Sequence, residues 1–493
     1  MMKVTITSNG KSKTVSAGRG QSLIEILRQN HYEIYAPCGG KGTCGKCLVE
    51  VKGDGPVLSC NYYPVKNVEI ILPDTKEANI LTSQTEYLYD LPLDEESTIR
   101  LSPHSYGVAV DIGTTTVVMY FLDLRSGKIE KIASFINPQS AFGADVITRI
   151  THCQLNATGL QDLHQAIISA LNREMRKFAA CRNISTASFE KLTFAGNTTM
   201  MHLLLGEDPV SIALSPFKPR FTATRKLRGD TTGLSVNKEA IVVTMPSVTA
   251  FVGADIIAGL AALNVNQKNY LFLDVGTNGE IALVTGDEIF TCAAAAGPAF
   301  EGANLTCGMS ARTGAISSFT GPGEYLVIGN SEPVGICGSG IVDIVAFLVA
   351  NGIVDETGYM KDHYVVNHDN NIYVTQKDIR EIQLAKSAIY SGMKILIKMR
   401  GLTFSDIDAL FLAGGFGNYI NIRSALQIGL LPEELTGKIY PVGNSAGIGA
   451  LQYLKSNEFV KRTDMIKNKA RYVELSNDDD FTTEFALNMS FTR

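Results

Sequence analysis

The chain has 493 residues, enough for about three domains of ordinary size. Its 44 lysines and arginines against 49 aspartates and glutamates give a formal net charge of −5, which lacks the basic excess that binding to a nucleic-acid backbone requires. The 45% of apolar and 19% of charged residues are typical of an ordered globular protein and exclude a disordered or fibrous one. We therefore expect several globular domains and no nucleic-acid partner.

Neither export nor a membrane span is indicated. The N-terminus alternates apolar and polar positions, as a strand hairpin does, and contains no continuous apolar run of the kind found in signal peptides. The most apolar stretch, residues 341–354, is interrupted by Asp343 and Asn351 and is shorter than the roughly 20 residues that cross a bilayer. We expect a cytoplasmic protein without a membrane partner.

Residues 1–74 predict a small α+β domain. Two short strands flank the Asn9-Gly10 turn, a helix is expected over residues 22–30, and two further strands are expected over residues 48–51 and 68–72. The order of these elements resembles a β-grasp ferredoxin.

An acidic segment separates this domain from the rest of the chain. Residues 75–100 hold six acidic residues against two basic ones and show no sustained apolar period. Such a composition favours a solvated linker over a packed element. We therefore predict a linker over residues 75–104.

The remaining chain repeats one α/β pattern. Near the start of residues 105–265, and again near the start of residues 266–493, a buried strand leads into an Asp-x-Gly-Thr turn and a second strand. In each half a later strand ends in Ala-Gly, at Gly196 and Gly414, and precedes a helix. Each half is expected to run three strands, helix, strand, helix, strand, helix, with a ligand held in the cleft between the halves.

Four cysteines lie close together in the N-terminal domain, separated by five, two and twelve residues: Cys38, Cys44, Cys47 and Cys60. Glycines in this loop allow backbone amides to approach the sulfides of an iron–sulfur cluster. The loop resembles that of plant-type [2Fe–2S] ferredoxins, although its first spacing is longer and its last is shorter. A structural zinc site is the alternative, but such sites usually present two Cys-x2-Cys pairs, and this loop has one. The other cysteines show no ligand spacing and are expected to be small buried side chains: Cys153, Cys181, Cys292, Cys307 and Cys337.

The two Asp-x-Gly-Thr turns predict phosphate binding. Each places a carboxylate at the end of a strand, with backbone and hydroxyl donors just after it, so that phosphate oxygens and Mg²⁺ can be held together. We assign the catalytic role to Asp111 and Asp274. The predicted phosphate donors are Gly113, Thr114, Thr115, Gly276, Thr277 and Asn278. One such turn alone would fit an ordinary hairpin, whereas two equivalent copies favour a phosphate clamp.

Two glycine-rich segments in the second half complete the predicted nucleotide site. Glycine at a strand-to-helix turn lets a nucleotide approach the backbone, and a helix N-terminus favours phosphate. The alternative for either segment is an ordinary loop. The predicted cofactor-binding residues are Gly338, Ser339 and Gly340 in the first segment and Gly414, Gly415 and Phe416 in the second. The second segment is the candidate for adenosine contact.

Two polar residues near these motifs allow two interpretations each. A loop could carry Glu301, in Gly-Pro-Ala-Phe-Glu-Gly, toward the γ-phosphate, or Glu301 could be a solvated acid. Asn197 could support the nucleotide, but its position before an apolar helix favours an N-cap.

The paired Asp-x-Gly-Thr turns, the Leu-Ala-Gly-Gly-Phe-Gly segment and the order of elements resemble the superfamily of acetate and sugar kinases, heat-shock chaperones and actin. Together with the ferredoxin-like domain, nearly the whole chain resembles the reductive activators of corrinoid-dependent methyltransferases. The resemblance implies an actin-like ATPase with slow turnover, which helps to transfer an electron from a [2Fe–2S] cluster to a Co(II) corrinoid protein and so restores Co(I). It also implies ATP and Mg²⁺ as cofactors and a low-potential donor, such as a ferredoxin or flavoprotein, as a second partner.

Other activities share this fold, so alternatives stay open. A small-molecule kinase of the actin-like superfamily with an attached ferredoxin domain would use the same cleft. The sequence also leaves open the client protein, the oligomeric state, with a homodimer among the options, and whether binding or hydrolysis of ATP drives the reduction.

Overall fold

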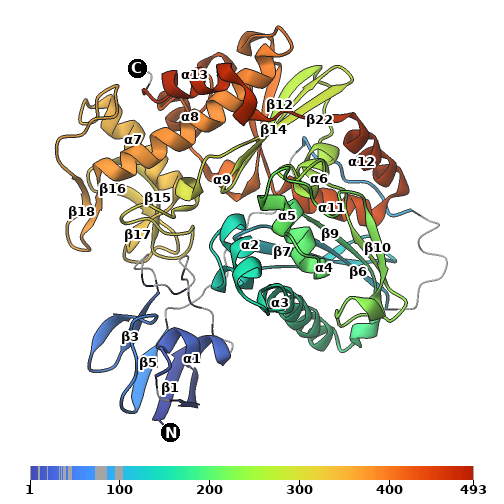
Figure 1. Cartoon of the computed structure of the whole chain (residues 1–493), viewed down its shortest axis with the longest axis vertical. Coiled ribbons are helices and arrows are strands. Elements are labelled where there is room, and N and C mark those ends of the chain that lie inside the picture. The colour runs from blue at the N-terminus through green and yellow to red at the C-terminus, as the bar shows by residue number, and fades with distance from the viewer. Residues whose placement is uncertain are drawn as a thin grey trace.

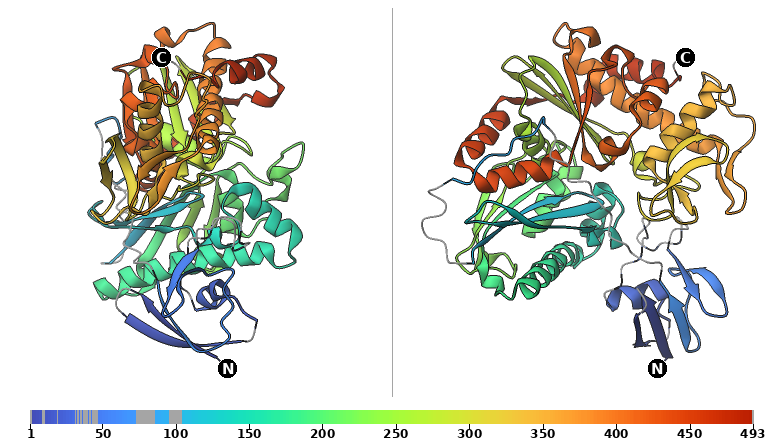
Figure 2. Two further views of the ribbon diagram at one scale, coloured as in Figure 1. Left: turned by 90° about the vertical axis from the view of Figure 1, so that its left-hand side faces the viewer. Right: turned by 180° about the vertical axis from the view of Figure 1, so that it is seen from behind.

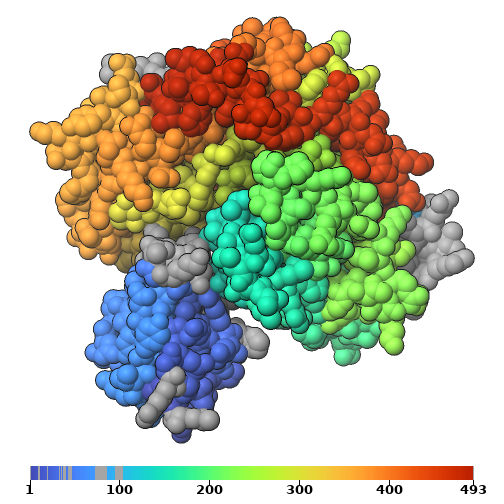
Figure 3. All heavy atoms as spheres, in the orientation of Figure 1, coloured from blue at the N-terminus to red at the C-terminus, as the bar shows by residue number. Residues whose placement is uncertain are grey.

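The computed structural model describes residues 2–8, 11–18, 20–30, 32, 34, 36, 40, 42, 47–72, 86–94 and 104–491. These residues form a small N-terminal domain, a segment over residues 86–94 that we call the strap, and a large core with two halves (Figure 1). In Figure 3 the N-terminal domain, in blue, protrudes from one end of the core. No helix within the described ranges is long and apolar enough to cross a membrane.

The N-terminal domain has the mixed sheet of a β-grasp ferredoxin. Its elements are β1 (Met2–Ser8), β2 (Lys11–Ala17), α1 (Leu23–Gln29), β3 (Leu48–Val51), β4 (Gly55–Leu58) and β5 (Val68–Ile71). In the sheet order β2-β1-β5-β3-β4, β1 and β5 are parallel and the other pairs are antiparallel. Helix α1 begins where Glu25 accepts a hydrogen bond from the Ser22 backbone at 2.8 Å, and its apolar face packs on the sheet.

The first half of the core is built on a six-stranded sheet. Its strands are β6 (Tyr106–Ile112), β7 (Thr116–Asp123), β8 (Ile129–Ile136), β9 (Phe189–Gly196), β10 (Arg225–Arg228) and β11 (Ile241–Thr244), in the order β10-β11-β9-β6-β7-β8. An antiparallel meander of β6, β7 and β8 is extended by β9 and β11, which run parallel to β6. The helices of this half are α2 (Val146–Leu155), α3 (Gly159–Arg182), α4 (Thr198–Leu205), α5 (Val210–Ala213) and α6 (Ala254–Ala262).

The second half repeats this sheet. Its strands are β12 (Asn269–Val275), β13 (Gly279–Thr285), β14 (Glu288–Ala294), β20 (Ala409–Ala413), β21 (Ile439–Gly443) and β22 (Ala470–Tyr472), in the order β21-β20-β12-β13-β14-β22. Strands β12, β13 and β14 again form a meander, and β20 and β21 run parallel to β12. The predicted duplication is confirmed, because five strands correspond in order and direction between the halves.

The second half also carries an insertion, drawn in yellow and light orange in Figure 2. Its elements are β15 (Ala315–Gly321), β16 (Glu324–Val327), β17 (Gly335–Ile336), α7 (Gly338–Ala350), β18 (Tyr364–Asn367) and β19 (Ile372–Val374). The remaining helices of this half are α8 (Gln376–Lys398), α9 (Gly414–Tyr419), α10 (Ile422–Gln427), α11 (Ser445–Lys455), α12 (Asn457–Lys469) and α13 (Asp479–Leu487).

Helices α6 and α11 join the two halves. Every residue of α11 is buried, and α6 is buried along its whole length except at Asp255. The two helices pack so closely that a Cβ at Gly449 would lie 2.1 Å from the Ala258 carbonyl oxygen. One apolar cluster contains both helices together with Tyr120 of β7 and Phe272 of β12. Any change in the angle between the halves must therefore be accommodated at this helix pair.

The strap corrects the prediction that the whole linker is solvated. Leu88 is buried and forms an isolated antiparallel bridge with Leu263, just after α6. The strap also contacts the second half, because Lys455 at the end of α11 pairs with Asp90 at 2.9 Å. Residues 86–94 are thus fastened to both halves at the α6/α11 pair.

Apolar side chains explain why this acidic segment packs. Tyr87, Tyr89, Leu91 and Leu93 pack against the cluster that contains α6 and α11, and burial of such surface favours a bound segment. A charge count averaged over residues 75–100 concealed this apolar stretch. The other predicted linker residues, 75–85 and 95–103, lie outside the described ranges.

Candidate functional site

Two of the four predicted cluster ligands are described, and the fold brings them together. Cys47 precedes β3 and Cys60 follows β4, and their Sγ atoms are 3.1 Å apart. Both side chains are free thiols and almost fully buried, with exposed fractions of 1% and 5%. A buried thiol pair at this distance fits two ligands of one metal site. Cys38 and Cys44 lie outside the described residues.

The backbone around this thiol pair is held in place. The Ser59 N–H donates to the Cys47 carbonyl at 2.8 Å, and the Ser59 carbonyl accepts from the Ile24 N–H of α1 at 3.0 Å. Gly42 has a φ of +78°, and a Cβ there would lie 2.8 Å from Asn61 Oδ1, so glycine is needed for this approach. The positive φ of Gly42 agrees with the backbone freedom predicted for the glycines of this loop, and the approach of their amides to cluster sulfides stays a prediction.

The first Asp-x-Gly-Thr turn joins β6 to β7. Asp111 is the penultimate residue of β6, and the Gly113 N–H closes the turn by donating to the Thr116 carbonyl at 2.9 Å. Thr114 and Thr115 lie at the tip of the turn and are partly exposed. The side chains with phosphate-binding chemistry are therefore accessible.

Two polar side chains brace this turn. Arg149 of α2 is completely buried, and its Nη2 donates to the Thr114 carbonyl at 2.5 Å. Asn197 donates from Nδ2 to Thr114 Oγ1 at 3.0 Å and accepts from the Met200 N–H as the N-cap of α4. The favoured interpretation of Asn197 as an N-cap is confirmed, and its amide also orients a phosphate-turn hydroxyl.

The second turn joins β12 to β13 and meets the predicted adenosine segment. The Gly276 N–H donates to the Asn278 carbonyl at 3.0 Å, and Asp274 lies one residue before the end of β12. Gly414 has a φ of +80°, and a Cβ there would lie 2.4 Å from Asp274 Oδ1. Only glycine fits at this position, so two motifs separated by 140 positions share one site.

Glu301 lies between the two turns. It ends the short 3₁₀ helix η5 (Pro298–Glu301), and its carboxylate accepts hydrogen bonds from Thr115 Oγ1 at 2.8 Å and from Thr277 Oγ1 at 2.6 Å. Thr115 belongs to the first half and Thr277 to the second. The two predicted phosphate turns therefore face each other across one carboxylate, and the interpretation of Glu301 as a solvated acid is wrong.

Four further carboxyl groups surround this junction: Asp111, Asp255, Asp274 and Glu280. Loss of solvation, reinforced by neighbouring carboxylates, raises the pKa of Asp111 to about 8 and that of Asp274 to about 7. Burial also raises the pKa values of Asp255 and Glu280. The raised pKa values of Asp111 and Asp274 bring the titration of these two carboxyl groups close to neutral pH.

Several of these residues were missed by the sequence analysis. Asp255 lies in the first turn of α6, and Asn444, which caps α11, hydrogen bonds with Asp111. Helices α6 and α11 occupy equivalent places in the two halves, so the repeat could have identified the polar residues at their N-terminal ends as site residues. Glu280 pairs with Asp274 across β12 and β13, which the sequence also implied. No sequence pattern indicated Arg149.

The carboxylates of this site fit a Mg²⁺ ion whose coordination is completed by the phosphates of a nucleotide. Within the parts of the chain that are described, no three histidine, cysteine, aspartate or glutamate side chains converge into a metal site. Mg²⁺ is usually bound by one or two carboxylates together with substrate phosphates and water. Asp111 and Asp274, each beside a phosphate turn, can supply those carboxylates.

The first glycine-rich segment serves close packing. Gly338, Ser339 and Gly340 form the buried first turn of α7. A Cβ at Gly338 would lie 1.8 Å from the Phe300 carbonyl oxygen, and one at Gly340 would lie 2.2 Å from the Ile316 carbonyl oxygen. Contact with η5 and β15 is sufficient to explain both glycines.

The second glycine-rich segment differs. A Cβ at Gly415 would meet no atom within 4 Å, so this backbone faces open space beside the second turn. Phe416 instead stacks on Phe300, with ring centroids 4.9 Å apart. In this segment the Gly415 backbone is therefore open to a ligand, whereas the Phe416 ring packs against the core.

The five remaining cysteines are free thiols. Cys292 and Cys337 are buried as expected, whereas Cys153 and Cys307 are partly buried. Cys181, near the end of α3, is exposed, so the expectation of burial is wrong there.

Three family models match the chain in succession. They are described as the 2Fe-2S iron-sulfur cluster binding domain, over residues 6–65, the RACo middle region, over residues 106–268, and the C-terminal domain of RACo, the ASKHA domain, over residues 268–493. These matches support a 2Fe–2S cluster in the N-terminal domain and ATP binding in the core.

Two curated relatives and one solved structure agree with these models. The corrinoid activation enzyme RamQ of Eubacterium limosum is 33% identical over 92% of this chain and 93% of its own. The [Co(II) methylated amine-specific corrinoid protein] reductase of Methanosarcina barkeri is 25% identical over 69% of this chain and 68% of its own. A solved structure of a reductive activator for corrinoid,iron-sulfur protein aligns with 100% of this chain and 98% of its own, at 30% identity and a TM-score of 0.72. The chain belongs to the RACo family, with a 2Fe–2S ferredoxin domain followed by the family's middle region and ASKHA domain.

Proposed function

We propose that this chain is an ATP-dependent reductive activator of a methyltransferase's corrinoid protein. One electron passes from the N-terminal domain to Co(II) of the corrinoid, which becomes Co(I), and a low-potential donor such as a ferredoxin or flavoprotein then reduces the N-terminal domain again. The observation that carries this proposal is that one chain combines a ferredoxin domain with two phosphate turns. Its relatives are named for corrinoid activation and for Co(II) corrinoid protein reduction.

We propose a set of residues for each task. Cys38, Cys44, Cys47 and Cys60 hold the cluster, and Asp111 and Asp274 hold Mg²⁺ with the nucleotide. The proposed phosphate and adenosine contacts are Gly113, Thr114, Thr115, Gly276, Thr277, Asn278, Gly414 and Gly415.

ATP contributes through conformation in this proposal. Reduction of Co(II) to Co(I) is harder than reduction of the ferredoxin domain, so an electron donor alone stalls. A nucleotide that binds one arrangement of the halves more tightly shifts the population toward it. The two phosphate turns belong to different halves, which are joined at α6 and α11, so phosphate binding can change the angle between the halves. A corrinoid protein that prefers the new arrangement is then reduced.

A small-molecule kinase is the second candidate function. It is less supported, because the relatives that cover nearly the whole chain at 30–33% identity are named for corrinoid activation.

One experiment separates the two functions. The anaerobically reduced protein is mixed with Co(II) corrinoid proteins, with and without Mg·ATP, while absorption spectra report Co(I). In parallel, the same protein is assayed for phosphorylated sugars and carboxylic acids. We expect Co(I) to form with ATP and no phosphorylated small molecule to accumulate. Rapid formation of such a product without Co(I) would favour the kinase.

A further inference from the structure

The Glu301 carboxylate connects the two phosphate turns directly. Its two oxygens accept hydrogen bonds from the hydroxyls of Thr115 and Thr277, at 2.8 and 2.6 Å. Each hydroxyl belongs to a turn that the proposed function assigns to ATP phosphates. A carboxylate that bridges two hydroxyl donors presents two anionic oxygens, as one edge of a phosphate group does.

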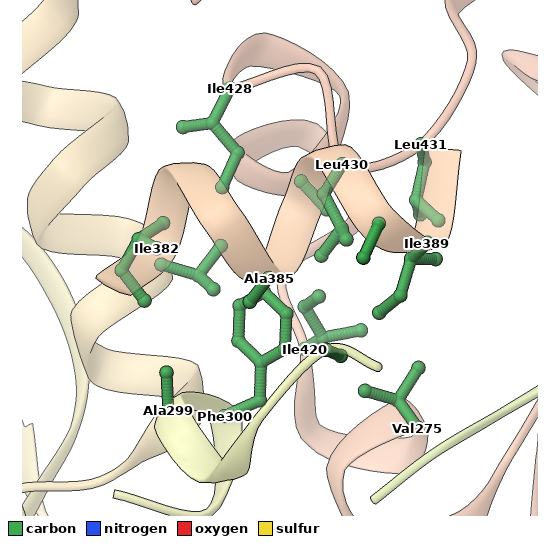
Figure 4. Packing of buried hydrophobic residues seen from close by; sticks show 14 of the residues in the cluster. Val275, Ala299, Phe300, Ile382, Ala385, Ile389, Ile420, Ile428, Leu430 and Leu431 are labelled. Carbon is green, nitrogen blue, oxygen red and sulfur yellow. The ribbon is translucent and has the colours of Figure 1, made fainter. Parts of the chain in front are cut away.

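Core packing fixes where this carboxylate lies. The side chain of Phe300, the residue before Glu301, is buried and points at Ala385 of α8 in Figure 4. The same ring stacks on Phe416, and the Phe300 carbonyl lies against the first turn of α7. The packing of Phe300 therefore holds the Glu301 backbone at the junction, so only side-chain freedom is lost when the carboxylate bridges the turns.

A terminal phosphate and the Glu301 carboxylate compete for the same donors. Both are anions, and each Thr hydroxyl has one proton to donate. Asp274 lies close enough for the Glu301 charge to raise its pKa, so a phosphate that joined Glu301 there would add a further negative charge to a carboxylate-rich site. Binding of the phosphate is easier when the carboxylate withdraws.

We propose that Glu301 is a positioning residue that occupies the place of the terminal ATP phosphate in the nucleotide-free chain and is displaced when ATP binds. This inference rests on the proposed ATP site. In the free chain, Glu301 keeps the two turns facing each other and lies close enough to the buried Arg149 cation to interact with its charge. When ATP enters, its terminal phosphate takes over both hydroxyls and the connection between the halves.

The test compares nucleotides that differ in the terminal phosphate. Calorimetric titrations of the full chain with Mg·ATP and Mg·ADP are made for wild type, Glu301→Gln and the matched control Glu332→Gln, whose side chain is exposed in the insertion. The amide keeps the shape of the carboxylate and removes the competing charge. We expect Glu301→Gln to bind Mg·ATP about fivefold more tightly, since removing one charge repulsion is worth on the order of 1 kcal/mol, and to bind Mg·ADP within about twofold of wild type. The control should behave as wild type with both nucleotides.

Unchanged or weaker Mg·ATP binding by Glu301→Gln, or an equal gain for Mg·ADP, would overturn the inference. The first result would mean that Glu301 assists the nucleotide, and the second that it does not stand at the terminal phosphate. If wild type itself bound no Mg·ATP, the proposed ATP site would fail, which is a different result.

A second variant supplies a readout without nucleotide. Glu301→Asp keeps the charge but is too short to span both hydroxyls. In the nucleotide-free chain, amide hydrogen exchange at residues 113–116 and 276–279 should be faster in Glu301→Asp than in wild type, and saturating Mg·ATP should remove the difference. Equal exchange in the two free proteins would show that Glu301 does not hold the turns together.

Discussion

At the scale of single residues, the junction between the halves is a group of closely spaced carboxyl groups. Burial raises the pKa of Asp111 to about 8 and that of Asp274 to about 7. A raised pKa means that the folded chain binds these protons more tightly than the unfolded chain does. The carboxyl groups are thus prepared for a ligand that brings positive charge, and they cost stability when they ionise without one.

The first prediction concerns this cost. Between the ordinary pKa of 3.8 and the folded value of about 8, the folded state holds a proton on Asp111 that the unfolded state releases. The resulting stabilisation is complete below about pH 4 and is lost as the pH rises through about 8, with a slope of up to about 1.4 kcal/mol per pH unit for one proton. Urea unfolding of nucleotide-free and Mg²⁺-free protein between pH 5 and 8 should therefore show a shallower fall in unfolding free energy for Asp111→Asn than for wild type. The control Asp369→Asn, at an exposed position, should retain the wild-type slope; equal slopes in Asp111→Asn and wild type would refute the assignment.

The second prediction concerns Mg·ATP itself. Asp111→Asn and Asp274→Asn keep the side-chain shape and remove a negative charge, so each should weaken Mg·ATP binding by about tenfold or more, equivalent to about 1.4 kcal/mol. Calorimetry measures the change, and circular dichroism checks the fold. Wild-type affinity in both variants would mean that the phosphate clamp lies elsewhere.

Sequence reasoning found the members of this site that carry a local motif. The two Asp-x-Gly-Thr turns and Gly414 stand in recognisable patterns, and the fold places Gly414 against Asp274. Arg149 reaches Thr114 from a helix 35 positions away, and that contact exists only through tertiary packing. A single sequence carries no signal for such a contact.

At the scale of elements, the strap is the main departure from expectation. Two of its three acidic residues have partners where it binds: Asp90 pairs with Lys455, and Asp94 accepts a hydrogen bond from the Asn457 N–H at the start of α12. Arg462 of α12 lies over the Tyr89 ring and also donates to the Ala261 carbonyl of α6. The strap is therefore part of the junction between the halves.

The third prediction tests this attachment. Leu88 is 8% exposed and packs in the cluster around α6 and α11, so Leu88→Ala should weaken the strap by about 2 to 3 kcal/mol. Limited chymotrypsin digestion should then cut within residues 86–94 faster than in wild type. Val65→Ala, at a position that is 88% exposed, is the control. Unchanged protection of the strap in Leu88→Ala would contradict the structure.

The duplicated halves were predictable because the same order of strand and turn patterns occurs twice in the sequence. The strap was not, because its apolar side chains find their partners on α6, α11 and α12, hundreds of positions away. The composition of a segment indicates whether it is solvated on its own. The structure of the strap is instead determined by the surface against which it packs.

At the scale of the whole molecule, the strap shortens the tether of the N-terminal domain. Only residues 73–85 separate Leu72 from the strap, and these span at most about 50 Å when fully extended. A free linker over residues 75–104 would reach about 100 Å. The N-terminal domain is thus tied to the junction between the halves, beside the helices that must adjust when the halves move.

The fourth prediction uses two cut sites. A protease site within residues 75–85 leaves the strap with the core, so cleavage should slow electron transfer through loss of effective concentration, and the N-terminal domain added at about millimolar concentration should restore part of the rate. A site within residues 95–100 leaves the strap on the N-terminal fragment, where its contacts with the core persist. This second cut should slow transfer less, as followed by the corrinoid spectrum. Equal losses from both cuts would show that the strap does not hold the fragments together.

The measurement that tests the central claim most directly is the yield of Co(I) on a client corrinoid protein in a single turnover, with saturating Mg·ATP and excess reductant. Wild type should reduce the corrinoid with ATP and much less without it. Cys47→Ser should abolish reduction while Mg·ATP still binds, and Asp274→Asn should keep a reducible cluster but lose the ATP stimulation. Equal Co(I) yields from wild type and Asp274→Asn, across several reductant potentials, would contradict the account, because the nucleotide site would then be uncoupled from the redox step.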